Sequence, residues 1–250
     1  MKTIAYSLFL GGLLSLSSAL ASAQSQSAME AYLCTLNDGK SMADVMEVIS
    51  DWNEWSDEQG ITSYTAWVMN PIFVSNADLN RQALWLGHAP SFTEMSATMG
   101  TWYAKGGELL QAFNDAWTCN THMEMTAMMV RPPAGEPSGT PVASFYDCSL
   151  NEGKGPEDLM AATSAWNKHL DDNGIQEAMV YHYPGHGHPQ DAAYDMKVSV
   201  WRGSLESYGK SADHFVNGGG QQAVAATLNQ AMTCDIPRMY QANLVRRAKN

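Results

Sequence analysis

Two repeated Trp–Asn pairs are the residues best suited by type to bind a small molecule. Each pair lies late on the apolar side of a predicted helix, and two further tryptophans lie on predicted strands. An aromatic ring beside an amide suits a planar or aromatic ligand, because the ring stacks and the amide fixes orientation. The alternative is that the tryptophans only pack helices onto a sheet. The candidate ligand-binding residues are Trp52, Asn53, Trp85, Trp166, Asn167 and Trp201.

A second chemical pattern is the histidine cluster of the segment 182–188. Its histidines, His182, His186 and His188, have a spacing that would let Zn or Cu take two or three imidazole ligands. The segment is rich in Gly and Pro, however, and the corresponding part of the first half of the chain has no histidine. We therefore expect an exposed hairpin loop and predict no metal, with these three residues as the weak candidates.

Acid–base chemistry has few other candidates. His88 or His182 would be the proton-transfer group if the protein is an enzyme, since imidazole titrates near neutral pH. No repeated His, Asp or Glu accompanies Trp52 and Trp166 in a way that would do acid–base work. The repeated pairs Asp44/Asp158 and Asp57/Asp171 are interpreted as surface charges at helix starts and ends. The sequence contains no nucleophile elbow, phosphate-binding loop, dinucleotide fingerprint or zinc-protease helix, which disfavours hydrolases and nucleotide enzymes.

The elements that must position these residues occur twice. Residues 32–61 align without a gap on residues 146–175, with about half of the positions identical, and the two cysteines and the first Trp–Asn pair stay in register. The match resumes later in the chain, where Trp85 aligns with Trp201 in Trp-Leu-Gly and Trp-Arg-Gly strand ends. Self-similarity of this length indicates an internal duplication.

The periodicity predicts the order β-α-β-β-α-β in each half. A segment with four prolines, 132–141, separates the halves and is typical of a semi-rigid connector. We therefore divide the chain into a first repeat, 24–131, and a second, 142–250. Glycines interrupt the helical pattern at 100–107 and 209–218, which we interpret as surface loops, with lids over a pocket as the alternative.

Four cysteines lie two in each repeat. An even number in an exported chain predicts two disulfides, and the duplication favours one within each repeat, Cys34–Cys119 and Cys148–Cys234. The alternative redox or metal role lacks a Cys-x-x-Cys spacing.

The amino terminus and the composition indicate the compartment. Lys2, an apolar run from 4 to 16 and the sequence Ala21-Ser-Ala23 are typical of a secretory signal peptide spanning 1–23. The chain of 250 residues carries 14 Lys and Arg against 26 Asp and Glu, a formal charge of −12, which disfavours nucleic-acid binding. We expect a periplasmic or secreted protein with no membrane span after signal cleavage.

The element order, repeat length and strand ends resemble those of the dimeric α/β-barrel superfamily, whose subunits are ferredoxin-like units that pair through their sheets. The resemblance covers 28–248 and implies an α+β fold of two tandem ferredoxin-like repeats that form the barrel within one chain, as a monomer. It places a ligand pocket between the sheet and helices of each unit. Members include cofactor-independent monooxygenases and haem-binding or haem-degrading enzymes.

Two functions follow as hypotheses. The favoured one is an exported binding or interaction protein whose barrel holds a small apolar or aromatic ligand, without a cofactor. The alternative is a cofactor-independent or haem-associated monooxygenase-like enzyme that acts on an aromatic or planar substrate. Haem or a transition metal belongs to the alternative only.

Overall fold

The computed structural model describes residues 26–75 and 81–249, so the predicted signal peptide lies outside the described residues. Its strands are β1 (Gln26–Leu36), β2 (Thr65–Phe73), β3 (Gln82–Ala89), β4 (Trp117–Arg131), β5 (Val142–Leu150), β6 (Ala178–Pro184), β7 (Met196–Arg202), β8 (Met232–Cys234) and β9 (Arg238–Arg246). Its helices are α1 (Met42–Glu58), α2 (Phe92–Lys105), α3 (Gly107–Ala116), α4 (Pro156–Asp172), α5 (Leu205–Asn217), α6 (Gly220–Ala226) and the 3₁₀ helix η2 (Leu228–Gln230).

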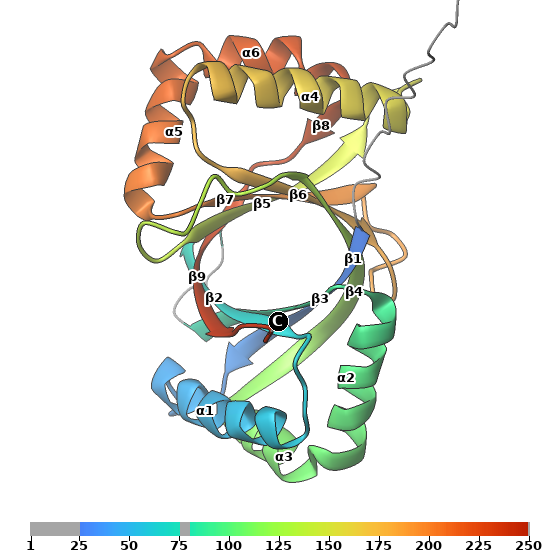
Figure 1. Ribbon diagram of the computed structural model, residues 1–250, viewed down its shortest axis with the longest axis vertical. Helices are drawn as coiled ribbons and strands as arrows, with labels where there is room; N and C mark the ends of the chain where they lie inside the picture. Colours follow the sequence, from blue (N-terminus) through green and yellow to red (C-terminus); the bar gives the residue numbers. More distant parts are fainter. Residues whose placement is uncertain (1–25, 76–80, 250) are drawn as a thin grey trace, which may run out of the picture.

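The strands form a closed antiparallel barrel. The sheet order is β7-β6-β4-β1-β3-β2-β9-β5, and β5 also pairs with β7, which closes the ring; β8 extends β5 at one end. Figure 1 shows the ring of strands between two groups of helices, with α4, α5 and α6 on one side and α1, α2 and α3 on the other. The described residues are thus an α+β protein with an eight-stranded barrel.

Within each half the strands take equivalent places. The first half has the neighbours β4-β1-β3-β2, and the second has β9-β5-β7-β6. Each half carries one helix more than the sequence predicts, because α2 and α5 run through the glycine-bounded segments that were interpreted as loops. An isolated glycine lowers helix propensity by only about 1 kcal/mol, which packing can override.

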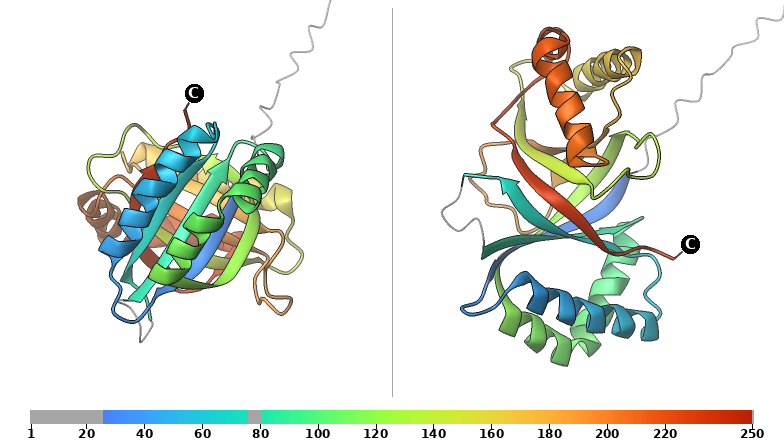
Figure 2. Two further views of the ribbon diagram at one scale, coloured as in Figure 1. Left: turned by 90° about the horizontal axis from the view of Figure 1, so that it is seen from below. Right: turned by 90° about the vertical axis from the view of Figure 1, so that its left-hand side faces the viewer.

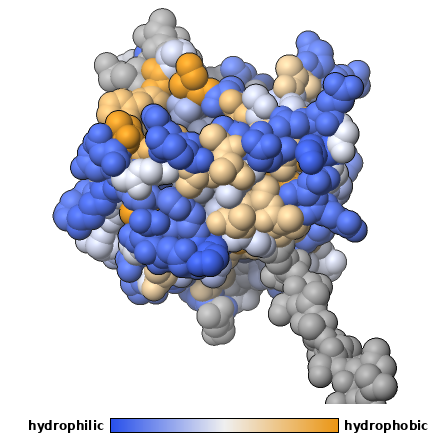
Figure 3. Space-filling model, turned by 90° about the horizontal axis from the view of Figure 1, so that it is seen from above, coloured by the Kyte–Doolittle hydropathy of each residue, from blue (hydrophilic) through white to orange (hydrophobic). Residues whose placement is uncertain are grey.

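Three apolar layers result from this arrangement. One lies between α1–α3 and the first half's strands, a second between α4–α6 and the second half's strands, and the third fills the barrel with Met, Ala and aromatic side chains. Figure 2 shows each helix group lying across the outer face of the sheet. Figure 3 views the end that carries α4, α5 and α6, where hydrophilic residues surround a central strip of moderately hydrophobic ones.

The predicted cysteine pairs are present in the structure. Cys34 is joined to Cys119 and Cys148 to Cys234, each linking the first strand of a half to a strand near that half's end. Two disulfides are compatible with export. Over the described residues, no helix combines the length and apolar character needed to cross a bilayer.

Two equivalent arginines hold the halves together. Arg246, on β9, donates to the carbonyl of Ile61 and to Asp57 Oδ1 (3.0 Å) at the end of α1. Arg131, on β4, donates to the carbonyl of Ile175 (3.2 Å) and to Asp171 Oδ1 (2.7 Å) at the end of α4. The last strand of each half is therefore bonded to the first helix of the other. We call these two clusters the arginine latches.

Candidate active site

A cavity of about 460 Å³ lies in the layer between the first half's strands and its helices. Its walls are aromatic, and the rings pack edge to face: Trp52 and Trp85 have centroids 5.0 Å apart, and Trp55 and Trp102 have centroids 5.5 Å apart. Such packing builds a stiff apolar wall suited to a flat ligand. The aromatic residues of this wall are Tyr32, Trp52, Trp55, Tyr64, Trp85, Trp102, Tyr103, Phe113 and Trp117.

One buried carboxylate, that of Glu30, stands on this aromatic wall. Glu30 is only 5% exposed. Its Oε1 accepts a hydrogen bond from the Tyr64 hydroxyl, and its Oε2 lies 2.7 Å from Nε2 of His122. Trp85 Nε1 in turn donates to the Tyr64 hydroxyl oxygen over 3.0 Å. The burial of a charge is tolerated here because both carboxylate oxygens have donors.

The strand register explains how distant residues meet. Glu30 on β1 lies opposite Gly87 on β3, and Tyr32 lies opposite both Trp85 on β3 and His122 on β4. Residues directly opposite in an antiparallel pair project to the same face, so all of these side chains point toward the helices.

Gly87 makes room for the hydrogen bond between Glu30 and Tyr64. A Cβ at this position would lie 1.8 Å from the Tyr64 hydroxyl oxygen and 2.8 Å from Glu30 Oε1. Any larger residue would therefore have to displace the tyrosine. The glycine is required here for space.

The network sets the protonation of its members. Burial, followed by the charge of Glu30, raises the pKa of Tyr64 well above its ordinary value, so the hydroxyl keeps its proton and donates. An ionised carboxylate only accepts, so Nε2 of His122 is the nitrogen that donates to Glu30, and in the neutral ring Nδ1 then has a lone pair. The imidazole stacks on the ring of Tyr32 with centroids 3.7 Å apart, which fixes its plane. His122 is thus oriented as a general base supported by a carboxylate.

The tryptophans predicted to bind a ligand fall into three places. Trp52 and Trp85 line the aromatic cavity. Trp166 is packed in the second half's layer, where it stacks on His169 with centroids 5.4 Å apart. Trp201 packs against the side chains that fill the barrel.

The strand register corrects the predicted equivalence of Trp85 and Trp201. Trp85 lies opposite Tyr32, whereas the matching Tyr146 lies opposite Val198, so Val198 takes the place of Trp85. Trp201 lies opposite Ala143 and faces the barrel interior, away from the helices. Trp201 lies three residues after Val198, and because this number is odd its side chain projects from the other face of the strand.

The two predicted asparagines bind backbone and lie at the arginine latches. Asn53 Nδ2 donates to the carbonyl of Val245 (2.7 Å), and Asn167 Nδ2 donates to that of Val130 (2.9 Å). Neither lines the aromatic cavity. Their repetition reflects a shared structural role.

The candidate histidines of the sequence lie away from the cavity. His182 is buried in the barrel, His186 Nδ1 lies 2.7 Å from Glu124, and His188 Nδ1 lies 3.0 Å from the Tyr194 hydroxyl. His88 lies opposite Met29, which faces the barrel. Within residues 26–75 and 81–249, no three His, Cys, Asp or Glu side chains form a group that could hold a metal ion.

Sequence reasoning missed Glu30, Tyr64 and His122 because it favoured repeated polar residues. It matched the Gly of Trp-Leu-Gly, Gly87, with Gly203, whereas the register puts Val200 in the place of Gly87 and Ser144 in that of Glu30. A usable signal was present, since a Glu within the otherwise apolar run 28–34 breaks the strand's pattern.

Haem, which the superfamily resemblance offers as an alternative cofactor, does not fit this cavity. Among the described residues that line it, no Lys or Arg is present to pair with two propionates. His122 is the single imidazole there, and its Nε2 contact with Glu30 would leave only Nδ1 to bind iron. Glu30 would add a repelling charge. In the other layer, the Nε2 atoms of His169 and His214 lie 2.9 Å apart and bond to each other.

Comparisons with known proteins identify the fold. No protein-family model matches the chain, and no curated protein sequence matches it. Solved structures do: a protein of proposed monooxygenase activity from Lactobacillus acidophilus has 7% identity and a TM-score of 0.57, covering 87% of this chain and 94% of the other.

Two further structures agree. A haem-binding protein from Thermus thermophilus has 9% identity and a TM-score of 0.51, with 86% and 90% of the two chains covered. An anthrone oxidase-like protein has 10% identity and a TM-score of 0.51, with 89% and 94% covered. At these identities the likeness concerns the fold alone, and the chain has the fold of the dimeric α/β-barrel superfamily.

Proposed function

We propose that this protein is an exported, monooxygenase-like enzyme that binds a planar aromatic substrate in the first half's cavity and works without a cofactor. The observation that carries the proposal is the buried Glu30, bonded to both His122 and Tyr64 on the wall of an aromatic cavity. A binding protein needs no supported imidazole on such a wall. The descriptions of the solved neighbours also favour this alternative over the binding module that the sequence suggested first.

The chemistry requires an acidic substrate. His122 Nδ1 would take a proton from a C–H or O–H group made acidic by aromatic rings, and Glu30 would stabilise the resulting imidazolium. An electron-rich carbanion of this kind reacts with O₂ directly. For a diaryl methylene, CH₂ plus O₂ gives C=O plus H₂O, so the substrate supplies all the electrons and no external reductant is needed.

We also infer that the two halves, 24–131 and 142–250, are fused copies of one ferredoxin-like unit, connected through 132–141. Equivalent strand neighbours, equivalent disulfides and equivalent arginine latches support the duplication. The barrel closes within one chain, which supports a monomer.

The test uses anthrone as the planar probe and the purified protein. Quenching of tryptophan fluorescence reports binding, and O₂ uptake together with anthraquinone formation reports turnover above the spontaneous reaction. Glu30→Gln and His122→Asn are expected to lower the rate by about 100- to 10,000-fold while anthrone still quenches the fluorescence. Trp166→Leu, in the other layer, serves as the matched control and should retain both signals.

Two results would contradict the proposal. If anthrone and related planar phenols leave the fluorescence unchanged, the cavity is not an aromatic binding site. If they bind but wild-type protein and His122→Asn take up O₂ equally, the protein is a binding module.

A further inference from the structure

A second cavity, of about 390 Å³, lies inside one end of the barrel, on the opposite face of the strands from the aromatic cavity. Its lining comes from both halves of the chain. Lining residues from the first half include Met29, Leu33, Leu84, Met123 and Met125; those from the second include Asp147, His182, Lys197, Arg238 and Tyr240.

The two walls differ in character at equivalent positions. Leu33 lies opposite Leu84, and the matching pair in the second half is Asp147 opposite Lys197. His182 lies opposite Lys197 in the same way as Met69 lies opposite Leu84. One wall of the barrel end is therefore apolar and methionine-rich, and the other carries charges and an imidazole.

His182 has a ring nitrogen that lacks a partner. The residue is 2% exposed, and its Nε2 lies 2.7 Å from the hydroxyl of Ser199, which also accepts from Trp201 Nε1 over 2.9 Å. The buried Ser199 hydroxyl can place its own proton only on Nε2, so Nδ1 carries the ring proton. Among the described residues, that Nδ1 has no hydrogen-bond partner.

The imidazole is neutral at every ordinary pH. Burial first, then the nearby charges of Lys197 and His88, lower its pKa to about 3. A buried N–H without an acceptor destabilises the folded protein, and an oxygen from a ligand would relieve this cost.

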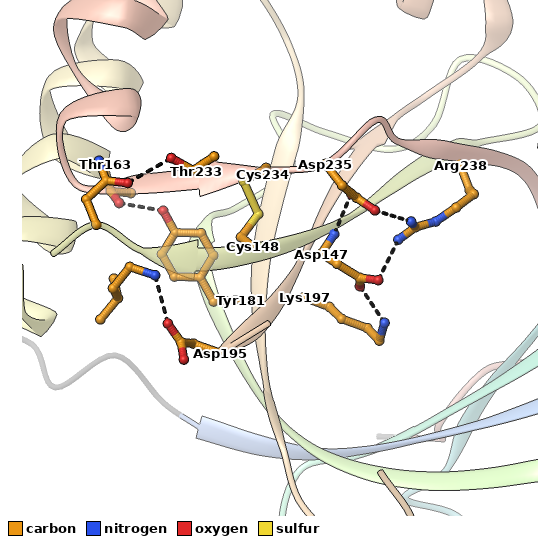
Figure 4. Close-up of a disulfide and its surroundings, with 12 residues drawn as sticks. Asp147, Cys148, Thr163, Tyr181, Asp195, Lys197, Thr233, Cys234, Asp235 and Arg238 are labelled. Carbon is orange, nitrogen blue, oxygen red and sulfur yellow. Dashed lines mark hydrogen bonds and ion pairs between the residues drawn. A yellow bond between two sulfur atoms is a disulfide. The ribbon is translucent and has the colours of Figure 1, made fainter. Parts of the chain in front are cut away.

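The charged side chains at the same wall also offer donors. Lys197 Nζ lies 2.5 Å from Asp147 Oδ1, and Arg238 Nη2 lies 3.3 Å from Asp147 Oδ2. Arg238 Nη1 binds Asp235 (2.5 Å). Figure 4 shows Lys197 and Arg238 reaching Asp147 from different strands. Both Asp147 oxygens are thus engaged, while an ammonium has three donors and a guanidinium five, which leaves donors for a further acceptor.

We propose that this barrel end is a second binding site, separate from the aromatic cavity, for a small amphipathic carboxylate. Its apolar body would lie on the methionine wall, and its carboxylate would accept from His182 Nδ1, Lys197 and Arg238. The site needs no catalytic step and stands whether or not the aromatic cavity is an active site.

Decanoate, with decanol as the uncharged comparison, is the probe for this site. In the purified protein labelled with ¹³C-methyl methionine, decanoate should shift the signals of Met29, Met123 and Met125 and leave that of Met99, which lines the aromatic cavity. We expect decanol to bind about tenfold more weakly. His182→Met, which introduces the residue type found at the equivalent Met69, should weaken decanoate binding roughly three- to tenfold.

Lys197→Gln provides a second variant that does not alter the buried Ser199 contact, and it should weaken binding by about tenfold. His186→Gln is the control, because His186 is exposed and lies outside the cavity. The proposal is overturned if decanoate shifts only Met99, if no methionine signal moves, if decanol binds as tightly as decanoate, or if neither site variant weakens binding.

Discussion

The two helix–sheet layers of this protein share one framework and differ in what fills it. In the first half, Glu30, Gly87 and Trp85 surround a cavity; at the same positions the second half has Ser144, Val200 and Val198. The second layer is packed with residues such as Leu159, Tyr181 and Met196. The same framework thus holds the Glu30 network where a glycine leaves room for it; where a valine stands, it holds a mainly apolar core beside the buried ion pair of Arg202 and Glu177.

Inside the barrel end, the charged pair comes from the second half and the equivalent apolar pair from the first. There the first half contributes Leu33 and Leu84, and the second contributes Asp147 and Lys197. The charged pair inside the barrel end therefore belongs to the second half, whereas the Glu30 network lies outside the barrel in the first half. The residues that the two halves share therefore maintain the scaffold, and the residues that differ give each half its chemistry.

Removing a disulfide should cause the largest loss of stability, and it tests whether the two halves are stabilised equally by their disulfides. Removing either disulfide, as Cys34→Ala with Cys119→Ala or Cys148→Ala with Cys234→Ala, should lower the free energy of unfolding by about 4–5 kcal/mol on the chain-entropy model. The closed loops span 85 and 86 residues, so this entropy is the same for both. Urea denaturation measures the losses; a difference above about 2 kcal/mol would show that the frameworks are not equivalent.

The arginine latches provide the next comparison. Arg131→Met and Arg246→Met each remove a largely buried guanidinium that bonds to helix-end carbonyls, and each should cost about 2–4 kcal/mol. Thermal unfolding of both variants should show similar losses. If Arg131→Met leaves the thermal unfolding of the protein unchanged, β4 is held to the second half by strand pairing alone.

Substitutions at Gly87 and at its counterpart Val200 test the difference between the two helix–sheet layers directly. Gly87→Val should displace the Tyr64 hydroxyl, cost about 1–3 kcal/mol through overpacking and abolish quenching by anthrone. Val200→Ala, its counterpart, should lose stability of similar size by leaving a cavity. It should not alter fluorescence quenching. If Gly87→Val binds anthrone as the wild type does, anthrone binding does not depend on the hydrogen bond between Glu30 and Tyr64.

The smallest effect concerns the starts of α1 and α4. Hydrogen bonds from Ser41 lower the pKa of Asp44, and the backbone of Gly155 lowers the pKa of Asp158. A lowered pKa stabilises the fold above the ordinary value of about 4, and this contribution is lost as pH falls below it. Asp44→Asn and Asp158→Asn should each be slightly less stable than wild type at pH 7 and indistinguishable from it at about pH 2, by urea denaturation.

Much of the fold could be predicted from the sequence, because hydrophobic period, capping residues and duplication agree. Ser41 is the N-cap of α1 and Pro156 the first residue of α4, and both residue types are typical of helix starts. Strand boundaries, such as the start of β2 at Thr65 and that of β4 at Trp117, are harder to predict. Those limits depend on pairing partners that are distant in sequence.

The candidate site was predictable only in part. Trp52 and Trp85 were found because apolar surface follows local periodicity. The network of Glu30, Tyr64 and His122 depends on register across three strands, which a one-residue shift would reverse, and the sequence does not specify it. The similarity between the two halves pointed instead to residues with a structural role, such as Asn53 and Asn167, which bond to backbone carbonyls.

The pairing of β2 with β9 has a consequence for the order in which the molecule assembles. β2 ends at residue 73, and its partner begins at residue 238, so one edge of the first half stays unpaired until almost the whole chain has been synthesised. Contacts between such distant residues slow folding, and an unpaired edge can join a second molecule. The final nine-residue strand, β9, therefore closes the barrel, and a chain truncated before residue 238 would keep β2 as an unpaired edge that can pair with a second molecule.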